Sequence, residues 1–177
     1  MIKCSKLDLE GALLFENLTF KDSRGSFSEV FKDLEYSKHL QGVKFIQDNE
    51  SVSNYGVLRG LHYQKGDYKQ SKLVRASYGE IQDVVVDIRK DSATFGKHIS
   101  VILSKDNNKQ IFVPKGFAHG FLVLSDFAIV NYKVDNIYSL KHESGLLYCD
   151  KDLDIKWNIE DVVVSEKDSL LPTLSEI

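Results

Sequence analysis

Short runs of β-branched and aromatic residues recur along the chain, and Gly, Asn, Asp and Ser separate them. Within the runs apolar and polar positions alternate, which is typical of strands that bury one face. The runs that fit this pattern are Val43 to Gln47, Val57 to Tyr63, Leu73 to Ser77, Ile81 to Arg89, His98 to Leu103, Gln110 to Val113, Gly120 to Leu124 and Phe127 to Val134. Turns are expected at Tyr78-Gly79 and Asp106 to Asn108.

Helical patterns cover only Asp33 to Leu40 and, near the end of the chain, Ser165 to Leu170. Many short strands with few helices are typical of an antiparallel sandwich or barrel. The chain has 177 residues, which is enough to bury a core of its own. Since no repeat, low-complexity tract or linker interrupts it, we expect one all-β domain over residues 1–177.

Several ionisable residues lie within these apolar strands, where such groups rarely occur without a partner or a task. His62, Lys72 and Tyr132 each share the alternation of small or apolar neighbours, as side chains inside a barrel do. Arg59 has the opposite alternation to His62. It reaches the same interior only if Gly60 permits a bulge, or if the strand ends there at a rim.

This set of side chains indicates proton-transfer chemistry. His62 can act as a base near neutral pH, and Tyr132 or Lys72 can act as an acid or stabilise an anion. Arginines suit phosphate groups. His119, beside Gly120 at the start of a run, can bind a ligand or satisfy loop carbonyls. The pattern alone does not distinguish an isomerase from a hydratase or a binding barrel.

Other chemistries lack their usual patterns. Gln64 stands where a β-barrel metal site often has the second His of a His-x-His pair, so no metal is expected, although His62, His119 and a carboxylate remain a possible ligand set. No GxSxG, GxGxxG or P-loop sequence is present, which argues against a serine nucleophile and a nucleotide cofactor. Lys72 stays open as a Schiff-base lysine.

Charge and composition exclude further classes of partner. The net charge of −3 and the pI of about 6.0 give no basic field for nucleic acid or an anionic membrane. No apolar stretch is long enough to span a bilayer, and the first residues do not resemble a signal peptide. Cys4 and Cys149 lack metal or redox spacing and are expected to be reduced thiols. We therefore expect a cytoplasmic protein with a small-molecule partner.

Longer motifs follow one another from Phe20 to Asp168: Phe20 to Phe31, Gln47 to Asn49, Gly56 to Gln64, Lys72 to Arg75, Asp83 to Arg89, Pro114 to Phe121, Asn131 to Lys133, Glu143 to Trp157 and Ser165 to Asp168. As an ordered set they resemble the dTDP-4-dehydrorhamnose 3,5-epimerases. The resemblance implies a cupin-like antiparallel jelly-roll β-barrel, usually a homodimer, acting on dTDP-4-dehydro-6-deoxy-D-glucose without cofactor or metal. The product would be dTDP-4-dehydro-L-rhamnose, a precursor for cell-surface polysaccharide.

The resemblance also implies catalytic roles. His62 would remove the protons from C3 and C5, on either side of the C4 ketone, and Lys72 would stabilise the enolate. Tyr132 would return a proton from the opposite face, and Asp168 would orient His62.

Binding roles follow in the same way. Contacts with the diphosphate or nearby sugar groups are implied for Arg24, Arg59 and Lys167. Sugar and nucleotide contacts are implied for Glu29, Gln47, Asn49, His119 and Glu143, with thymine stacking on Tyr138. In the family, the segment with Arg24 and Glu29 reaches into the partner subunit's site.

Two segments depart from the family's pattern. The loop Lys65 to Ser71 lacks the Pro and Gly expected there, and Leu147 to Asp152 replaces a more usual Trp-Asn-Asp-Pro sequence. Both leave room for another sugar or nucleotide. The alternatives are a single-centre epimerase at C3 or C5, a non-catalytic sugar-nucleotide-binding cupin, and a metal-dependent cupin oxygenase.

Overall fold

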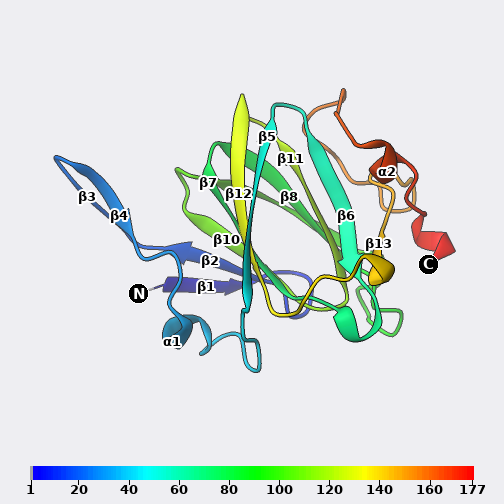
Figure 1. Cartoon of the computed structure of the whole chain (residues 1–177), viewed down its shortest axis with the longest axis horizontal. Helices are drawn as coiled ribbons and strands as arrows, with labels where there is room; N and C mark the ends of the chain where they lie inside the picture. The colour runs from blue at the N-terminus through cyan, green and yellow to red at the C-terminus, as the bar shows by residue number, and fades with distance from the viewer. Residues whose placement is uncertain (1) are drawn as a thin grey trace.

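The computed structural model describes residues 2–177, and two antiparallel sheets make up most of it. The larger sheet has six strands in the order β1-β2-β10-β7-β12-β5, and the smaller has five in the order β13-β6-β11-β8-β9 (Figure 1). One core cluster contains side chains from both sheets, so the sheets pack face to face. This arrangement is the expected cupin-like jelly roll, with only a few short helices.

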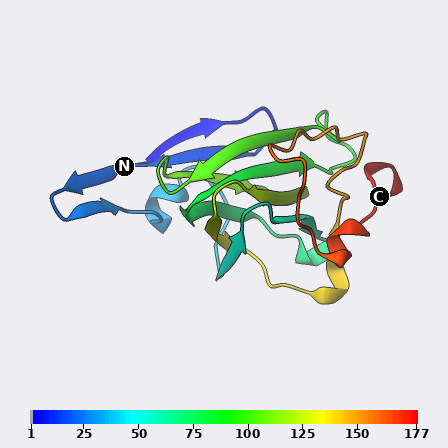
Figure 2. The same cartoon turned by 90° about the horizontal axis from the view of Figure 1, so that it is seen from above.

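The strands of the larger sheet are β1 (Ile2–Lys6), β2 (Leu13–Asn17), β10 (Lys109–Val113), β7 (Lys72–Tyr78), β12 (Phe127–Val134) and β5 (Gln47–Asn54). Those of the smaller sheet are β13 (Glu143–Gly145), β6 (Leu58–Gln64), β11 (Phe117–Val123), β8 (Glu80–Asp87) and β9 (His98–Ser104). A separate hairpin consists of β3 (Thr19–Asp22) and β4 (Gly25–Ser28). It projects from one end of the molecule (Figures 1 and 2).

The helical segments are α1 (Asp33–Tyr36), α2 (Glu166–Ser169), and the 3-10 turns η1 (Gly66–Tyr68), η2 (Leu140–His142) and η3 (Leu174–Glu176). The prediction of a helix to Leu40 is too long, since α1 ends at Tyr36. Within residues 2–177 the structure contains no helix with the length and hydrophobicity to cross a membrane.

Most predicted runs coincide with strands to within a few residues, but Val43 to Gln47 is wrong. Strand β5 begins only at Gln47 and continues through a polar stretch to Asn54. It is an edge strand with mostly exposed positions, so its sequence carries little apolar alternation. The alternation likewise missed the short or exposed strands β1 to β4 and β13.

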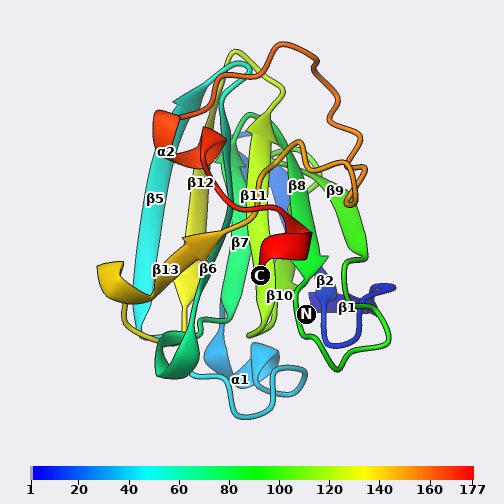
Figure 3. The ribbon, with the colours of Figure 1, turned by 90° about the vertical axis from the view of Figure 1, so that its right-hand side faces the viewer.

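Strand β8 is buried on both faces, which explains why its apolar residues run consecutively from Val84 to Val86. Ile81 and Val85 face the core between the sheets. Val84 and Val86 face outward and pack in a second cluster with residues of the C-terminal segment, including Trp157. That segment, orange to red in Figure 3, runs across the outer face of the smaller sheet. Each fully buried side chain of this kind stabilises the fold by about 1.5–3 kcal/mol.

Strand β6 carries a bulge where it passes β11. His62 pairs with His119, and Arg59 pairs with Phe121, so three steps along β6 match two along β11. The extra residue places Arg59 and His62 on the same face of the strand. This bulge meets the condition that the sequence sets for both side chains to reach one interior. Gly60 has φ +135°, and a Cβ there would lie 2.6 Å from the Cα of Gly120. Only glycine fits this contact.

We predict that Gly60→Ala destabilises the protein by about 3 kcal/mol or more, because it adds a backbone clash to an unfavourable φ. Gly25→Ala is the matched control: Gly25 has φ +130° with no atom within 4 Å of the added Cβ. The control should cost only about 1–2 kcal/mol. Urea unfolding measures both, and equal losses would contradict a constraint from the contact with Gly120.

Candidate active site

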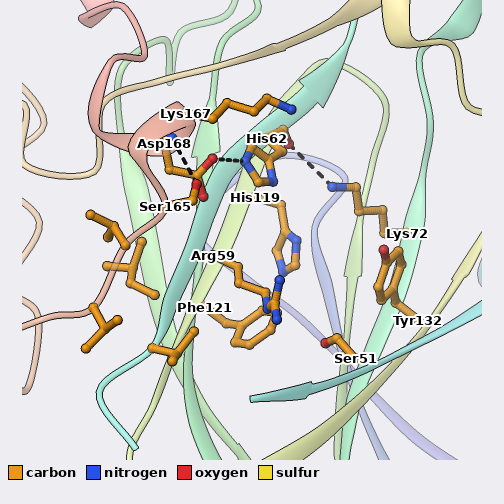
Figure 4. A pocket seen from close by; sticks show the side chains of 14 residues that line it. Ser51, Arg59, His62, Lys72, His119, Phe121, Tyr132, Ser165, Lys167 and Asp168 are labelled. Carbon is orange, nitrogen blue, oxygen red and sulfur yellow. Dashed lines mark hydrogen bonds and ion pairs between the residues drawn. The ribbon is translucent and has the colours of Figure 1, made fainter. Parts of the chain in front are cut away.

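A cavity of about 560 Å³ lies between the two sheets and is closed on one side by the C-terminal segment (Figure 4). The smaller sheet contributes Arg59, His62, His119 and Phe121. The larger sheet contributes Ser51, Lys72 and Tyr132, and the C-terminal segment contributes Ser165, Lys167 and Asp168. The cavity therefore has two facing walls, each with its own ionisable groups.

Asp168 holds the ring of His62. The Nε2 atom of His62 lies 2.7 Å from Asp168 Oδ1, and the Gly60 amide donates to Asp168 Oδ2 at 3.2 Å. Asp168 is itself fixed at the start of α2, where its amide donates to the capping Ser165 Oγ at 3.1 Å. Both oxygens of this buried carboxylate are thus hydrogen-bonded. One contacts the His62 ring, and the other is anchored by the Gly60 amide.

The surroundings of His62 favour a neutral ring. Burial lowers its pKa below the usual value of histidine, although the hydrogen bond and charge of Asp168 act in the opposite direction. In the neutral ring, Nε2–H donates a hydrogen bond to the Asp168 carboxylate, which leaves Nδ1 without a proton. His62 is therefore suited to act as a base at neutral pH.

Lys72 brings a cation to the opposite wall. Its Nζ donates to the backbone oxygen of His62 at 3.4 Å. The pKa of Lys72 is lowered to about 8, because the effect of burial exceeds the opposing effect of the charges of Asp83 and Glu143. The ammonium group is therefore protonated at neutral pH but only by a small margin.

Tyr132 extends from β12, beside Lys72 (Figure 4). Burial raises its pKa, with a smaller opposing effect from Arg59. Its hydroxyl therefore remains protonated near neutral pH and can donate a proton. The base lies on the smaller sheet and this acid lies on the larger one.

Two further polar side chains of the cavity, His119 and Arg59, are held by partners. His119 Nε2 lies 2.8 Å from Asp83 Oδ2, and both side chains are almost fully buried. The Nε atom of Arg59 donates to the Ser53 hydroxyl at 2.9 Å. Within residues 2–177 no group of three or more His, Cys, Asp or Glu is arranged to hold a metal ion.

A second set of charges lies beside Asp168, where Lys167 pairs with Glu143 at 2.5 Å. The Tyr138 hydroxyl donates to the same Glu143 oxygen at 2.9 Å. Burial alone would raise the pKa of Glu143, but these two hydrogen bonds outweigh it and lower the pKa. Glu143 is therefore ionised at neutral pH.

Known proteins with the same sequence pattern and fold are sugar-nucleotide epimerases. The family model for dTDP-4-dehydrorhamnose 3,5-epimerase matches residues 6–176. The chain is 48% identical over 164 residues to the dTDP-4-dehydrorhamnose 3,5-epimerase of Shigella flexneri, covering 92% of this chain and 91% of that protein. The chain belongs to the dTDP-4-dehydrorhamnose 3,5-epimerase family. It is therefore an isomerase of the epimerase type.

Two solved structures extend this comparison to three dimensions. The dTDP-6-deoxy-D-glucose-3,5-epimerase of Legionella pneumophila, in complex with dTDP-4-keto-L-rhamnose, has a TM-score of 0.96 and 41% identity, covering 100% of this chain and 95% of that one. The dTDP-4-dehydrorhamnose 3,5-epimerase of Bacillus anthracis, with TDP and PPi bound, has a TM-score of 0.95 and 44% identity, covering 98% and 99%.

The epimerase fold brings most of the predicted site residues into one place. The cavity is lined by His62, Lys72, Tyr132, Asp168, Arg59, His119 and Lys167. Glu143 and Tyr138 join them through Lys167. Gln47 donates to Asn49 at 2.7 Å, and both share the face of β5 that carries Ser51.

Arg24 and Glu29 lie apart from the cavity of their own chain. Arg24 is at the turn of the β3–β4 hairpin, where it pairs with Asp22 at 2.6 Å. Glu29 follows the hairpin, and its carboxylate lies 4.0 Å from Lys32. The structure therefore does not bring these two predicted residues to the cavity of their own chain.

The sequence interpretation overlooked Asp83, Ser51, Ser53 and Ser165 as parts of the site. Asp83 carried a usable signal, because it is a carboxylate inside an apolar run, as His62 is a histidine inside one. The serines carried none, since small polar residues are common on exposed strands and at helix starts.

We predict that Asp168→Asn lowers the pKa of His62 further, because the carboxylate is what raises it against the effect of burial. NMR titration of the histidine ring signals, assigned with a His62→Gln variant, measures this pKa without substrate. Glu166→Gln is the control, because Glu166 lies two positions before Asp168 in the same helix and is exposed. A His62 pKa that rises or stays constant in Asp168→Asn would contradict the pairing.

Proposed function

We propose that this protein inverts C3 and C5 of dTDP-4-dehydro-6-deoxy-D-glucose and so forms dTDP-4-dehydro-L-rhamnose. The observation that carries the proposal is the placement of a base, His62, and an acid, Tyr132, on facing walls of one cavity. Inversion at carbon requires a proton to leave from one face and another to arrive at the opposite face. The names and ligands of the relatives support the nucleotide sugar as substrate.

The first step is proton removal. Nδ1 of the neutral His62 takes the proton from a carbon next to the C4 ketone, and the electron pair moves onto the ketone oxygen to form an enolate. The resulting imidazolium donates from Nε2 to Asp168, whose negative charge stabilises it. The Gly60 amide and the cap at Ser165 keep this carboxylate in place.

Lys72 stabilises the enolate. Its ammonium group is partly buried and, among residues 2–177, has one long hydrogen bond, to the His62 carbonyl, so it is free to donate to a developing oxyanion. A cation acts more strongly in such a cavity than in water because the local dielectric constant is low.

Tyr132 completes the inversion by donating its hydroxyl proton to the same carbon from the other side. Tyr132 then regains a proton and His62 loses one before the second carbon reacts. The raised pKa of Tyr132 ensures that the resting residue is the acid.

The nucleotide end of the substrate is assigned to the cations and polar groups around this centre. Arg59 and Lys167 contact the diphosphate, and His119 contacts the sugar. Further nucleotide and sugar contacts come from Gln47, Asn49, Tyr138 and Glu143.

Arg24 and Glu29 act in the site of a partner subunit, so the working unit is a homodimer. In support, the β3–β4 hairpin leaves two paired aromatic side chains uncovered: Phe20 is 64% exposed and Phe27 is 68% exposed. The Arg24 side chain is 88% exposed. A projecting hairpin with exposed aromatic rings is typical of a protein–protein contact.

Proton NMR in D2O with dTDP-4-dehydro-6-deoxyglucose tests the reaction. We expect the wild type to exchange both H3 and H5, and His62→Ala to slow exchange by about 10³-fold or more. Tyr132→Phe should retain exchange but lose the L-rhamno product, because His62 can return deuterium to the face it deprotonated. His39→Ala, an exposed histidine outside the cavity, is the control.

The same experiment separates the alternatives. Exchange of one proton only would show a single-centre epimerase. Binding without exchange in the wild type would show a sugar-nucleotide-binding protein and would refute the proposed reaction.

Mixing two inactive variants tests the shared site. We expect Arg24→Ala and His62→Ala homodimers to be weak, while their random heterodimers each regain one intact site. After denaturation and joint refolding, about a quarter of the wild-type activity should return. His62→Ala mixed with Lys72→Ala is the control, since both residues lie in one chain's cavity; in that mixture no heterodimer site is intact. Equal recovery in both mixtures, or none, would contradict the exchange of Arg24 between subunits.

A further inference from the structure

Asp83 is a buried carboxylate with an unused oxygen. It lies on β8 with 0% exposure, and it alternates with Ile81 and Val85, which face the core between the sheets. Its Oδ2 lies 2.8 Å from His119 Nε2, and its Oδ1 has no hydrogen-bond partner among residues 2–177. A buried charge with half of its acceptor capacity free is costly unless another charge compensates for it.

Two other buried carboxylates, Asp87 and Asp150, are satisfied by structural partners. Asp150 accepts from the amides of Asp152 and Leu174. Asp87 accepts from Arg89, Ser92 and Thr94. Within residues 2–177 Asp83 has neither a backbone donor nor an arginine as partner, and its one hydrogen-bond partner there is a histidine that lines the cavity. A purely structural role does not account for this arrangement.

The charge of Asp83 acts on the cavity lysine, Lys72. The titratable groups that face Lys72 come from five strands: His62 on β6, Asp83 on β8, His119 on β11, Tyr132 on β12 and Glu143 on β13. The carboxylates in this set are Asp83 and Glu143. Glu143 is already paired with Lys167, whereas Asp83 is not paired with any lysine or arginine within residues 2–177.

We propose that Asp83 is a positioning residue of the site: it is the counter-ion that keeps Lys72 protonated, and it fixes the ring of His119 toward the cavity. For catalysis this inference rests on the proposed epimerase function. The effect of Asp83 on Lys72 does not, because it is a property of the free protein.

The two roles serve the same chemistry. The pKa of Lys72 is about 8, since burial lowers it more than nearby charges raise it. Among those charges Asp83 has the largest effect. Without Asp83 the lysine would lose its proton near neutral pH and could not stabilise an enolate. Because Asp83 accepts from His119 Nε2, the Nδ1 of that ring is left as an acceptor for a hydroxyl of the sugar.

Competitive labelling of the free protein tests the counter-ion role directly. The protein reacts with a trace of acetic anhydride between pH 6 and pH 10, and mass spectrometry quantifies acetylation of the peptide that contains Lys72. We expect a midpoint near pH 8 in the wild type. In Asp83→Asn the midpoint should fall by about one pH unit or more, since the opposing charge is gone. Asp150→Asn, another buried carboxylate, should leave it unchanged.

A second variant and a second readout keep the outcome decisive. Asp83→Leu removes the charge without burying an unpaired amide, and it replaces Asp83→Asn if that variant does not fold. In the D2O exchange assay, either variant should lose more activity at pH 8 than at pH 6.5. A folded variant with an unchanged Lys72 midpoint would overturn the inference, whatever its activity. Absence of exchange in the wild type would refute the proposed function and leave the labelling result standing.

Discussion

The hydrogen bonds of one carboxylate hold the site together. Asp168 belongs to the C-terminal segment, yet it bonds to the His62 ring and to the Gly60 amide, more than a hundred positions earlier. The segment reaches that place because its apolar residues cover the outer face of the smaller sheet, as Trp157 and Leu153 do. Packing on the outside of the barrel therefore fixes the orientation of a ring on the inside.

The packing of two sheets face to face also explains why the ionisable groups of the cavity lie on opposite walls. Side chains on the inner face of one sheet point toward the other, so His62 and Tyr132 line the cavity from opposite walls without any special loop. The interior is apolar below the cavity, where Val74, Val85 and Val130 pack. This low-dielectric floor shifts the pKa values of His62 and Lys72 downward and that of Tyr132 upward. The same burial thus favours a neutral base and a protonated acid.

The sequence predicted those parts of the molecule that alternation or an unusual charge reveals. The buried strands from β6 to β12 follow from their apolar runs, and Lys72 and Tyr132 were placed inward by their neighbours. Strand β5 was misplaced because an edge strand needs few apolar residues. The bulge at Gly60 was stated only as a condition for Arg59, since strand pairing depends on β11, which lies far away in the sequence. The polar partners of the site escaped prediction for the same reason: Asp83 and Ser53 acquire their roles through contacts with His119 and Arg59.

The contact between β6 and β11 shows that a residue can be indispensable for packing without taking part in chemistry. Neither Gly60 nor Gly120 has a side chain that could take part in chemistry, yet a Cβ at either position would lie within 3 Å of the opposite backbone. In a survey of every single substitution, both positions would tolerate as little change as His62. Intolerance there would record how closely two strands approach, whereas intolerance at His62 would record the proton transfer proposed for that ring. If the active site were defined only by the positions that tolerate no substitution, it would therefore wrongly include Gly60 and Gly120 on the strand pair that shapes it.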